Sequence, residues 1–139
     1  RDLIYTDGRL HGSASPPSGI TLTEDQAIKA STALNSAEIP YGPSAMCFEP
    51  RDAVVFYDKD NNVIASVSIC FTCCRTRIEP ASMSRAVNYV ELAKFFAPLQ
   101  LKGGYVFQNG TPDAYIEHYM QRVARWKQKI LERGQSKIR

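Results

Sequence analysis

Residues 52–71 limit the folds open to this chain more than any other segment. Two runs rich in β-branched and aromatic residues, DAVVFY and VIASVSICF, are separated by the polar sequence DKDNN. This pattern predicts a β-hairpin. Asn61 suits the left-handed backbone conformation that the turn requires, because Asn tolerates positive φ better than most residues.

The turn also predicts the register of the hairpin. If Asp58 lies opposite Asn62, Tyr57 faces Val63 and the numbers of all facing residues add up to 120. Side chains alternate between the two faces of a strand. One face is then expected to carry a continuous apolar surface, which needs a covering layer, and its members are Ala53, Val55, Tyr57, Val63, Ala65, Val67, Ile69 and Phe71.

Helical patterns on both sides of the hairpin supply that layer. Thr23 and Gln26 form a capping-box pattern at the start of a short helix with a thin apolar stripe around Ile28 and Leu34. The sequence SMSRAVNYVELAKFF, which begins at residue 82, predicts a second helix.

A third and longest helix is predicted to begin at Thr111, which suits the N-cap position, with Pro112 in the first turn, and to end at Gly134. Its buried stripe is expected to contain Ile116, Tyr119, Met120, Val123, Trp126, Lys127 and Ile130. The short apolar run YVF, residues 105–107, predicts a further strand after a Gly-Gly turn.

These patterns predict an α+β fold. A small antiparallel sheet, built on the central hairpin of about residues 52–71, packs against two or three helices. Residues 1–20 are rich in Gly, Ser and Pro and are predicted to form a flexible tether or loop, and residues 21–139 are predicted to form a single domain.

Composition argues against several partners. The formal net charge of +3 gives no reason by itself to expect nucleic acid. No apolar run approaches the ~20 residues of a membrane span.

Because the chain begins with Arg1 rather than Met, we expect that a leader was removed. A periplasmic or extracellular protein is therefore predicted, with room for a lipid anchor on the removed segment, although a cytoplasmic location stays open.

The four cysteines leave several interpretations open. The predicted register places Cys47 opposite Cys73, or opposite Cys74 after a slip of one residue, within reach of a disulfide. Structural zinc needs four ligands at suitable spacing, and the adjacent Cys73 and Cys74 fit that need poorly. A redox C-x-x-C usually lies at a helix N-terminus, whereas Cys70 lies inside a predicted strand. We therefore expect no metal and no other cofactor.

Signatures of other enzyme classes are missing from the sequence. It contains no phosphate-binding loop, dinucleotide fingerprint, HExxH motif or nucleophile elbow. A cysteine nucleophile would need a histidine base, and His118 lies near Arg122 and Arg125 on a charged helical face that we interpret as solvated. These absences argue against an enzyme.

The segment MCFEPRDAVVFYDKDNNVIASVSICFTCC resembles a pattern in uncharacterised bacterial proteins, several of them exported. In that pattern CF-x-PR is followed by a hairpin and then by ICF-x-C, and the matching residues here are Cys47, Phe48, Pro50, Arg51, Ile69, Cys70, Phe71 and Cys73. The resemblance covers about 30 of the 139 residues and implies no activity. The residue after the Arg is often His in the pattern, whereas this chain has Asp52, which removes a potential ligand or base.

These observations favour a small, non-enzymatic, exported binding module, such as an inhibitor or immunity-type protein that engages another protein. Its contact surface is expected among the charged residues around the cysteine end of the hairpin, namely Glu49, Arg51, Arg75 and Arg77. The alternative is a thiol-redox or metal-binding protein that uses Cys47, Cys70, Cys73 and Cys74.

Overall fold

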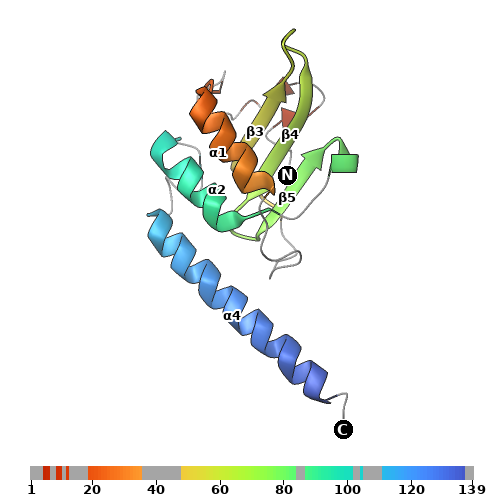
Figure 1. Ribbon diagram of the computed structural model, residues 1–139, viewed down its shortest axis with the longest axis vertical. Helices are drawn as coiled ribbons and strands as arrows, with labels where there is room; N and C mark the ends of the chain where they lie inside the picture. The colour runs from red at the N-terminus through yellow and green to blue at the C-terminus, as the bar shows by residue number, and fades with distance from the viewer. Residues whose placement is uncertain are drawn as a thin grey trace.

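The computed structural model of the chain has the predicted α+β fold (Figure 1). It describes residues 5–6, 9–10, 12, 19–35, 48–83, 87–101, 104 and 111–136. Three strands form an antiparallel sheet in the order β3-β4-β5, namely β3 (Asp52–Tyr57), β4 (Val63–Cys70) and β5 (Arg75–Glu79). The short strands β1 (Tyr5–Thr6) and β2 (Arg9–Leu10) pair separately with each other.

Helices cover one face of the three-stranded sheet. Figure 1 shows α1 (Glu24–Asn35) and α2 (Tyr89–Phe96) side by side on this face, with α4 (Pro112–Ser136) running below them. Two single turns of 3-10 helix, η1 (Ala81–Met83) and η2 (Ala97–Leu99), lie before and after α2. None of the described helices combines the length and the apolar character that crossing a membrane requires.

The turn between β3 and β4 is the predicted one. Asn61 has a φ of 63°, and its N–H donates to the carbonyl oxygen of Asp58 at 3.1 Å. The Asp58 carboxylate accepts hydrogen bonds from the N–H groups of Asp60 and Asn62 at 2.8 and 2.9 Å. These contacts explain the polar sequence of the turn, because its side chains satisfy the backbone groups that the ladder leaves unpaired.

The predicted register holds only at the tip of the hairpin. Tyr57 faces Val63 as expected, but a bulge follows and Phe56 faces Ala65, so that Ile64 is the extra residue. The prediction was therefore wrong for the rest of β3. Val54 rather than Val55 faces the core, and it lies opposite Val67.

Exposure explains why the bulge is tolerated. Tyr57, Val63 and Ile64 are all exposed, so the tip of the hairpin stands outside the core and need not follow its pleat. Further along β4 the opposite situation holds, because every residue from position 65 to position 70 is buried. The central strand is thus covered on both faces.

The third strand of the sheet is β5, a segment to which the sequence pattern assigned no strand. It pairs with β4 through Cys70↔Arg75 and Ser68↔Arg77. Of its side chains only Ile78 is buried, which explains the weak sequence signal. The strand predicted at residues 105–107 lies outside the described residues.

Helix α1 begins at the predicted capping box. The N–H of Thr23 donates to Gln26 Oε1 at 2.9 Å, and the N–H of Gln26 donates to Thr23 Oγ1 at 3.3 Å. The buried side of the helix is not centred on Ile28, which is exposed, but on small residues and one leucine: Ala30, Ala33 and Leu34. Small residues allow close packing against α2.

Helix α2 begins seven residues later than predicted, at Tyr89. Asn88 is its N-cap, and the Asn88 side chain accepts hydrogen bonds from the N–H groups of Val90 and Glu91, both at 3.1 Å. An Asn directly before an apolar run is a recognised start signal, which the apolar spacing upstream obscured. The Asn88 N–H also donates to the carbonyl oxygen of Ala33 at 3.1 Å and so ties α2 to α1.

Helix α4 begins as predicted, with Thr111 Oγ1 accepting a hydrogen bond from the Ala114 N–H at 3.3 Å. Its predicted stripe is confirmed at Tyr119 and Val123, which are buried, and was wrong at Met120, Lys127 and Ile130, which are exposed. Tyr115, which the prediction did not include, is also buried. In Figure 1 the first half of α4 lies next to the other described elements, whereas its second half extends away from them.

Candidate functional site

The most distinctive local chemistry lies at residues 70–74, which join β4 to β5 and are called the disulfide turn below. Cys70 and Cys73 form a disulfide across a sequence separation of 3, with a Cα–Cα distance of 5.7 Å. Both cysteines are buried. The bond therefore closes the turn locally and offers no exposed sulfur for exchange.

This pairing rules out the Cys47–Cys73 disulfide that the predicted register allowed. The prediction extended the strand ladder past Cys70, but the chain leaves β4 at that residue and turns, which brings Cys73 back to Cys70. Cys47 lies outside the described residues. Cys74 is free and buried.

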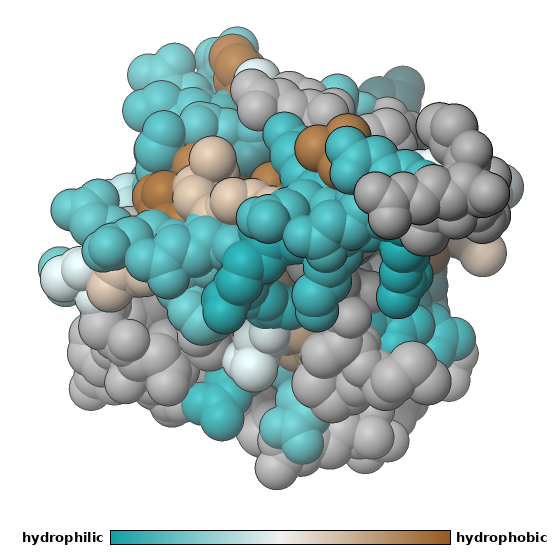
Figure 2. Space-filling view, turned by 90° about the horizontal axis from the view of Figure 1, so that it is seen from below, coloured by the Kyte–Doolittle hydropathy of each residue, from teal (hydrophilic) through white to brown (hydrophobic). Residues whose placement is uncertain are grey.

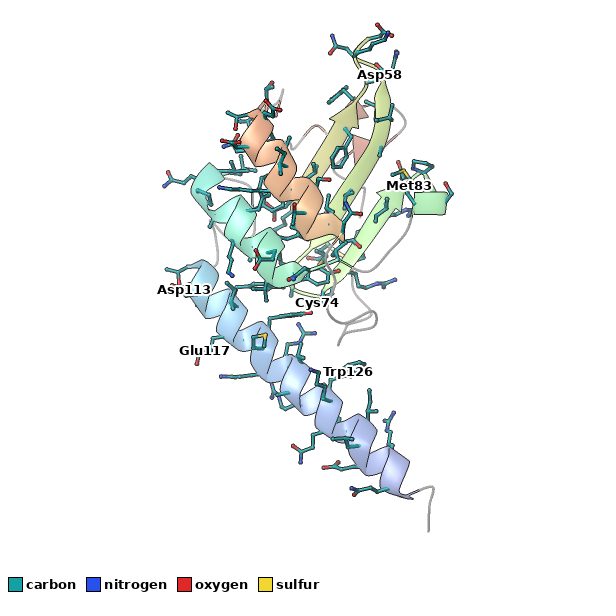
Figure 3. The ribbon with its side chains drawn as sticks, in the orientation of Figure 1. Asp58, Cys74, Met83, Asp113, Glu117 and Trp126 are labelled. Carbon is teal, nitrogen blue, oxygen red and sulfur yellow. A yellow bond between two sulfur atoms is a disulfide. The ribbon has the colours of Figure 1, made fainter. Side chains whose placement is uncertain are left out.

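Cys74 is buried where the disulfide turn approaches α4, and Figure 3 labels its position. Its backbone is left-handed, with a φ of 51°. Its thiol donates to the carbonyl oxygen of Phe71 at 3.5 Å and lies 3.8 Å from the Tyr115 hydroxyl. Arg122 Nη1 donates to Cys74 Sγ at 3.4 Å and to the carbonyl oxygen of Thr72 at 3.1 Å.

Electrostatics keep the Cys74 thiol protonated. Burial raises the pKa of Cys74, and the positive charge of Arg122 and the hydrogen bond with Tyr115 only partly offset that effect. Burial also raises the pKa of Tyr115. Since the nucleophile of thiol chemistry is the thiolate, Cys74 is placed as a structural group rather than a reactive one.

An aromatic cluster centred on Phe71 packs the disulfide turn against α2 and α4. The ring centroid of Phe71 lies 6.4, 6.0 and 5.2 Å from those of Tyr89, Phe96 and Tyr115, with the rings edge to face. The Tyr115 hydroxyl also donates to the carbonyl oxygen of Phe71 at 3.4 Å. The cluster joins the disulfide turn to α2 and α4.

Three of the four predicted contact residues lie on one face of the sheet. Successive side chains of a strand point to opposite faces of the sheet. Arg75 and Arg77 therefore point away from the helices, on the face opposite the buried Ile78. Arg51 has the same orientation, because it directly precedes Asp52 and so points to the opposite face from it. All three arginines are exposed. Glu49 is also exposed but precedes the strand.

The described residues give no support to a metal site. Among them, no group of three or more His, Cys, Asp or Glu side chains is arranged to hold a metal ion. The sulfurs of Cys70 and Cys73 are bonded to each other, and His118 is exposed on α4.

Sequence reasoning missed the α4 side of this site. The contacts of Tyr115 and Arg122 with the disulfide turn were not predicted from the sequence. Tyr115, Tyr119 and Val123 nevertheless recur at every fourth position. That spacing places them on one helical face and was the available signal. The contact between Arg122 and Thr72 spans 50 residues and has no local signature.

The state of the sulfurs gives a first testable prediction. Alkylation of the native protein without reductant is expected to leave Cys70, Cys73 and Cys74 unmodified, because the first two are bonded and the third is buried. Unfolding without reductant should expose Cys74 alone among the three, and peptide mass mapping reads out each cysteine. Replacing both bonded residues, as C70S/C73S, should lower the free energy of unfolding by about 2 kcal/mol, since the closed loop is short.

Labelling of Cys70 or Cys73 in the native, unreduced protein would contradict the disulfide. The C74S variant serves as the control, because it removes a sulfur from the same turn and leaves the bond in place.

Comparisons with known proteins returned no relatives: no family model, no curated protein and no solved structure matches the chain.

Proposed function

We propose that the chain is a small, non-enzymatic, exported binding module that engages another protein, in the manner of an inhibitor or immunity-type protein. The projecting half of α4 carries this proposal. Among the described side chains of the helix the last buried one is Val123, yet the helix continues to Ser136, which is 13 residues or about 20 Å further. Figure 1 shows this half standing clear of the other described elements.

Apolar side chains on the projecting half support a docking role. Ile130 and Leu131 are 49% and 67% exposed. A helical segment this short is marginal in water on its own, and its bulky apolar side chains gain nothing while they face solvent. Docking of an amphipathic helix into a groove of a partner is a recurrent mode of protein recognition.

The sulfur chemistry fits the same proposal. Disulfides persist in oxidising compartments, where exported proteins are found. The thiol-redox alternative needs an accessible thiolate of low pKa, whereas burial raises the pKa of Cys74. The exposed side chains of Arg51, Arg75 and Arg77 are a second candidate contact for the same partner.

The test uses a partner that is first identified by crosslinking in the source organism and then purified. The variant I130Q/L131Q is expected to bind that partner at least tenfold more weakly, because it removes the apolar contacts and keeps high helix propensity. Its matched control is I28Q/I64Q, which makes the same kind of change at residues that are 58% and 56% exposed elsewhere on the surface.

Equal affinity of the two double variants would overturn the α4 surface. The variant R75A/R77A tests the arginine face separately, and unchanged binding would remove that face from the contact. Thermal unfolding of each variant confirms that a loss of binding is not a loss of fold.

A further inference from the structure

We propose that the partner presents an acidic segment to the projecting half of α4. The contact would be made by a basic–aromatic strip, defined here as Trp126, Lys127, Lys129 and Ile130. This inference rests on the proposed function and adds the chemistry of the partner.

The apolar part of the strip continues the buried side of α4. Tyr119, Val123, Trp126 and Ile130 follow one another at spacings of four, three and four residues, which places them on one face of the helix. The first two are buried by the domain, Trp126 is half-buried and Ile130 is exposed. In Figure 3, Trp126 lies further along α4 than the contact with Cys74. The helix face that packs on the domain therefore continues as an apolar face into the projecting half of α4.

Positive charge surrounds this apolar face. From position 122 to position 136 the helix carries five basic side chains and one acidic side chain, namely Arg122, Arg125, Lys127, Lys129, Arg133 and Glu132. Lys127 and Lys129 flank the Trp126–Ile130 line on its two sides. Seen from below in Figure 2, small apolar patches lie among predominantly hydrophilic side chains.

Intramolecular roles do not account for the two lysines. Favourable interaction of cations with the helix dipole is limited to the last turn, whereas Lys127 and Lys129 precede the end at Ser136 by nine and seven residues. Among the described residues neither lysine has an acidic side chain within ion-pair distance, unlike Lys94, which pairs with Glu91 on α2. Both lysines are exposed.

Charge complementarity indicates which kind of partner binds the basic–aromatic strip. A second copy of this chain would bring like charges together, which costs free energy. A phosphate backbone would pair with the lysines but would make no favourable contact with Ile130. A bilayer would bury little apolar surface of the strip, because the strip offers one Trp and one Ile bordered by lysines. An acidic segment that also carries bulky apolar residues complements both parts of the strip.

Trp126 provides the readout, because it is the only tryptophan of the chain. The probe is a synthetic, end-capped helical peptide of Glu and Leu, titrated into the full chain while Trp emission is recorded. A saturable blue shift is expected at low salt, with affinity at least tenfold lower at 300 mM than at 50 mM NaCl because the attraction is screened.

The charge-reversal variant K127E/K129E should reduce the affinity for the Glu/Leu peptide at least tenfold. Its matched control, K29E/K59E, makes the same change in net charge at exposed positions on α1 and in the hairpin turn, and should bind as the unmodified chain does. The milder variant K127Q/K129Q keeps the test available if charge reversal impairs folding.

Several results would overturn the inference. Equal weakening by K127E/K129E and K29E/K59E would mean that net charge alone attracts the peptide. Tighter binding to vesicles containing phosphatidylglycerol, or to a single-stranded oligonucleotide, would assign the strip to a membrane or a nucleic acid. A purified protein partner that is lost in I130Q/L131Q but kept in K127E/K129E would refute the acidic partner and leave the proposed function intact.

Discussion

Replacing Phe71 with alanine is expected to lower the free energy of unfolding by about 3–5 kcal/mol, the range for deletion of a fully buried aromatic ring. The Phe71 side chain is only 1% exposed and meets Tyr89, Phe96 and Tyr115 edge to face. The cavity would open where the disulfide turn, α2 and α4 meet, so no single element can move in to fill it. Domains are stable by only about 5–15 kcal/mol, and the variant should therefore be partly unfolded at moderate temperature.

Equilibrium unfolding in urea measures this effect. The conservative variant F71L should cost less than half as much as F71A, because most of the volume is kept. Tyr57, an aromatic residue at the exposed tip of the hairpin, is the control position, and Y57A should change the free energy of unfolding by less than about 1 kcal/mol. Equal losses for F71A and Y57A would contradict the central role of the aromatic cluster.

The second large effect is expected at alkaline pH, where the protein should lose stability steeply. Burial raises the pKa of Tyr89, Tyr115 and Cys74 above their ordinary values. The unfolded chain releases these protons near pH 9 to 10, while the folded chain retains them. The stabilisation is thus complete below about pH 8, and it declines as the pH rises toward the raised pKa values.

The expected size follows from proton linkage. Each such group removes up to about 1.4 kcal/mol per pH unit above its unfolded pKa. The two tyrosines together should therefore cost about 2–3 kcal/mol at one unit above pH 10. Urea unfolding at pH 8, 9, 10 and 11 measures the slope, and Y115F should make it shallower because the titrating hydroxyl is absent. A free energy of unfolding that stays constant up to pH 11 would contradict the burial of these groups.

Features set by neighbouring residues were predictable from the sequence. The hairpin turn at Asn61 and the capping box of Thr23 and Gln26 form as expected, because the groups that define them lie within a few residues of one another. The register was not predictable beyond the tip. The bulge at Ile64 reflects where the core ends, and the pattern of the two strands does not record that boundary.

The candidate site was predicted only in part, for a related reason. Alternation along the strands brings Arg51, Arg75 and Arg77 to a common face, and their role as contact residues stays a prediction. The Cys70–Cys73 bond depends on the chain leaving β4 at Cys70, which no apolar pattern marks. Likewise, the buried side of α4 depends on which part of the helix meets the domain.

The anchoring of α4 has a mechanical consequence. The helix is held through its first half, where Arg122 and Tyr115 bond to carbonyl groups of the disulfide turn, and about 20 Å of it extends beyond Val123. A tilt of about 10° at the anchor displaces the far end by about 3–4 Å. The helix is therefore a lever: a load applied near Ile130 exerts torque on those hydrogen bonds, and small rearrangements at the disulfide turn become large displacements at the tip.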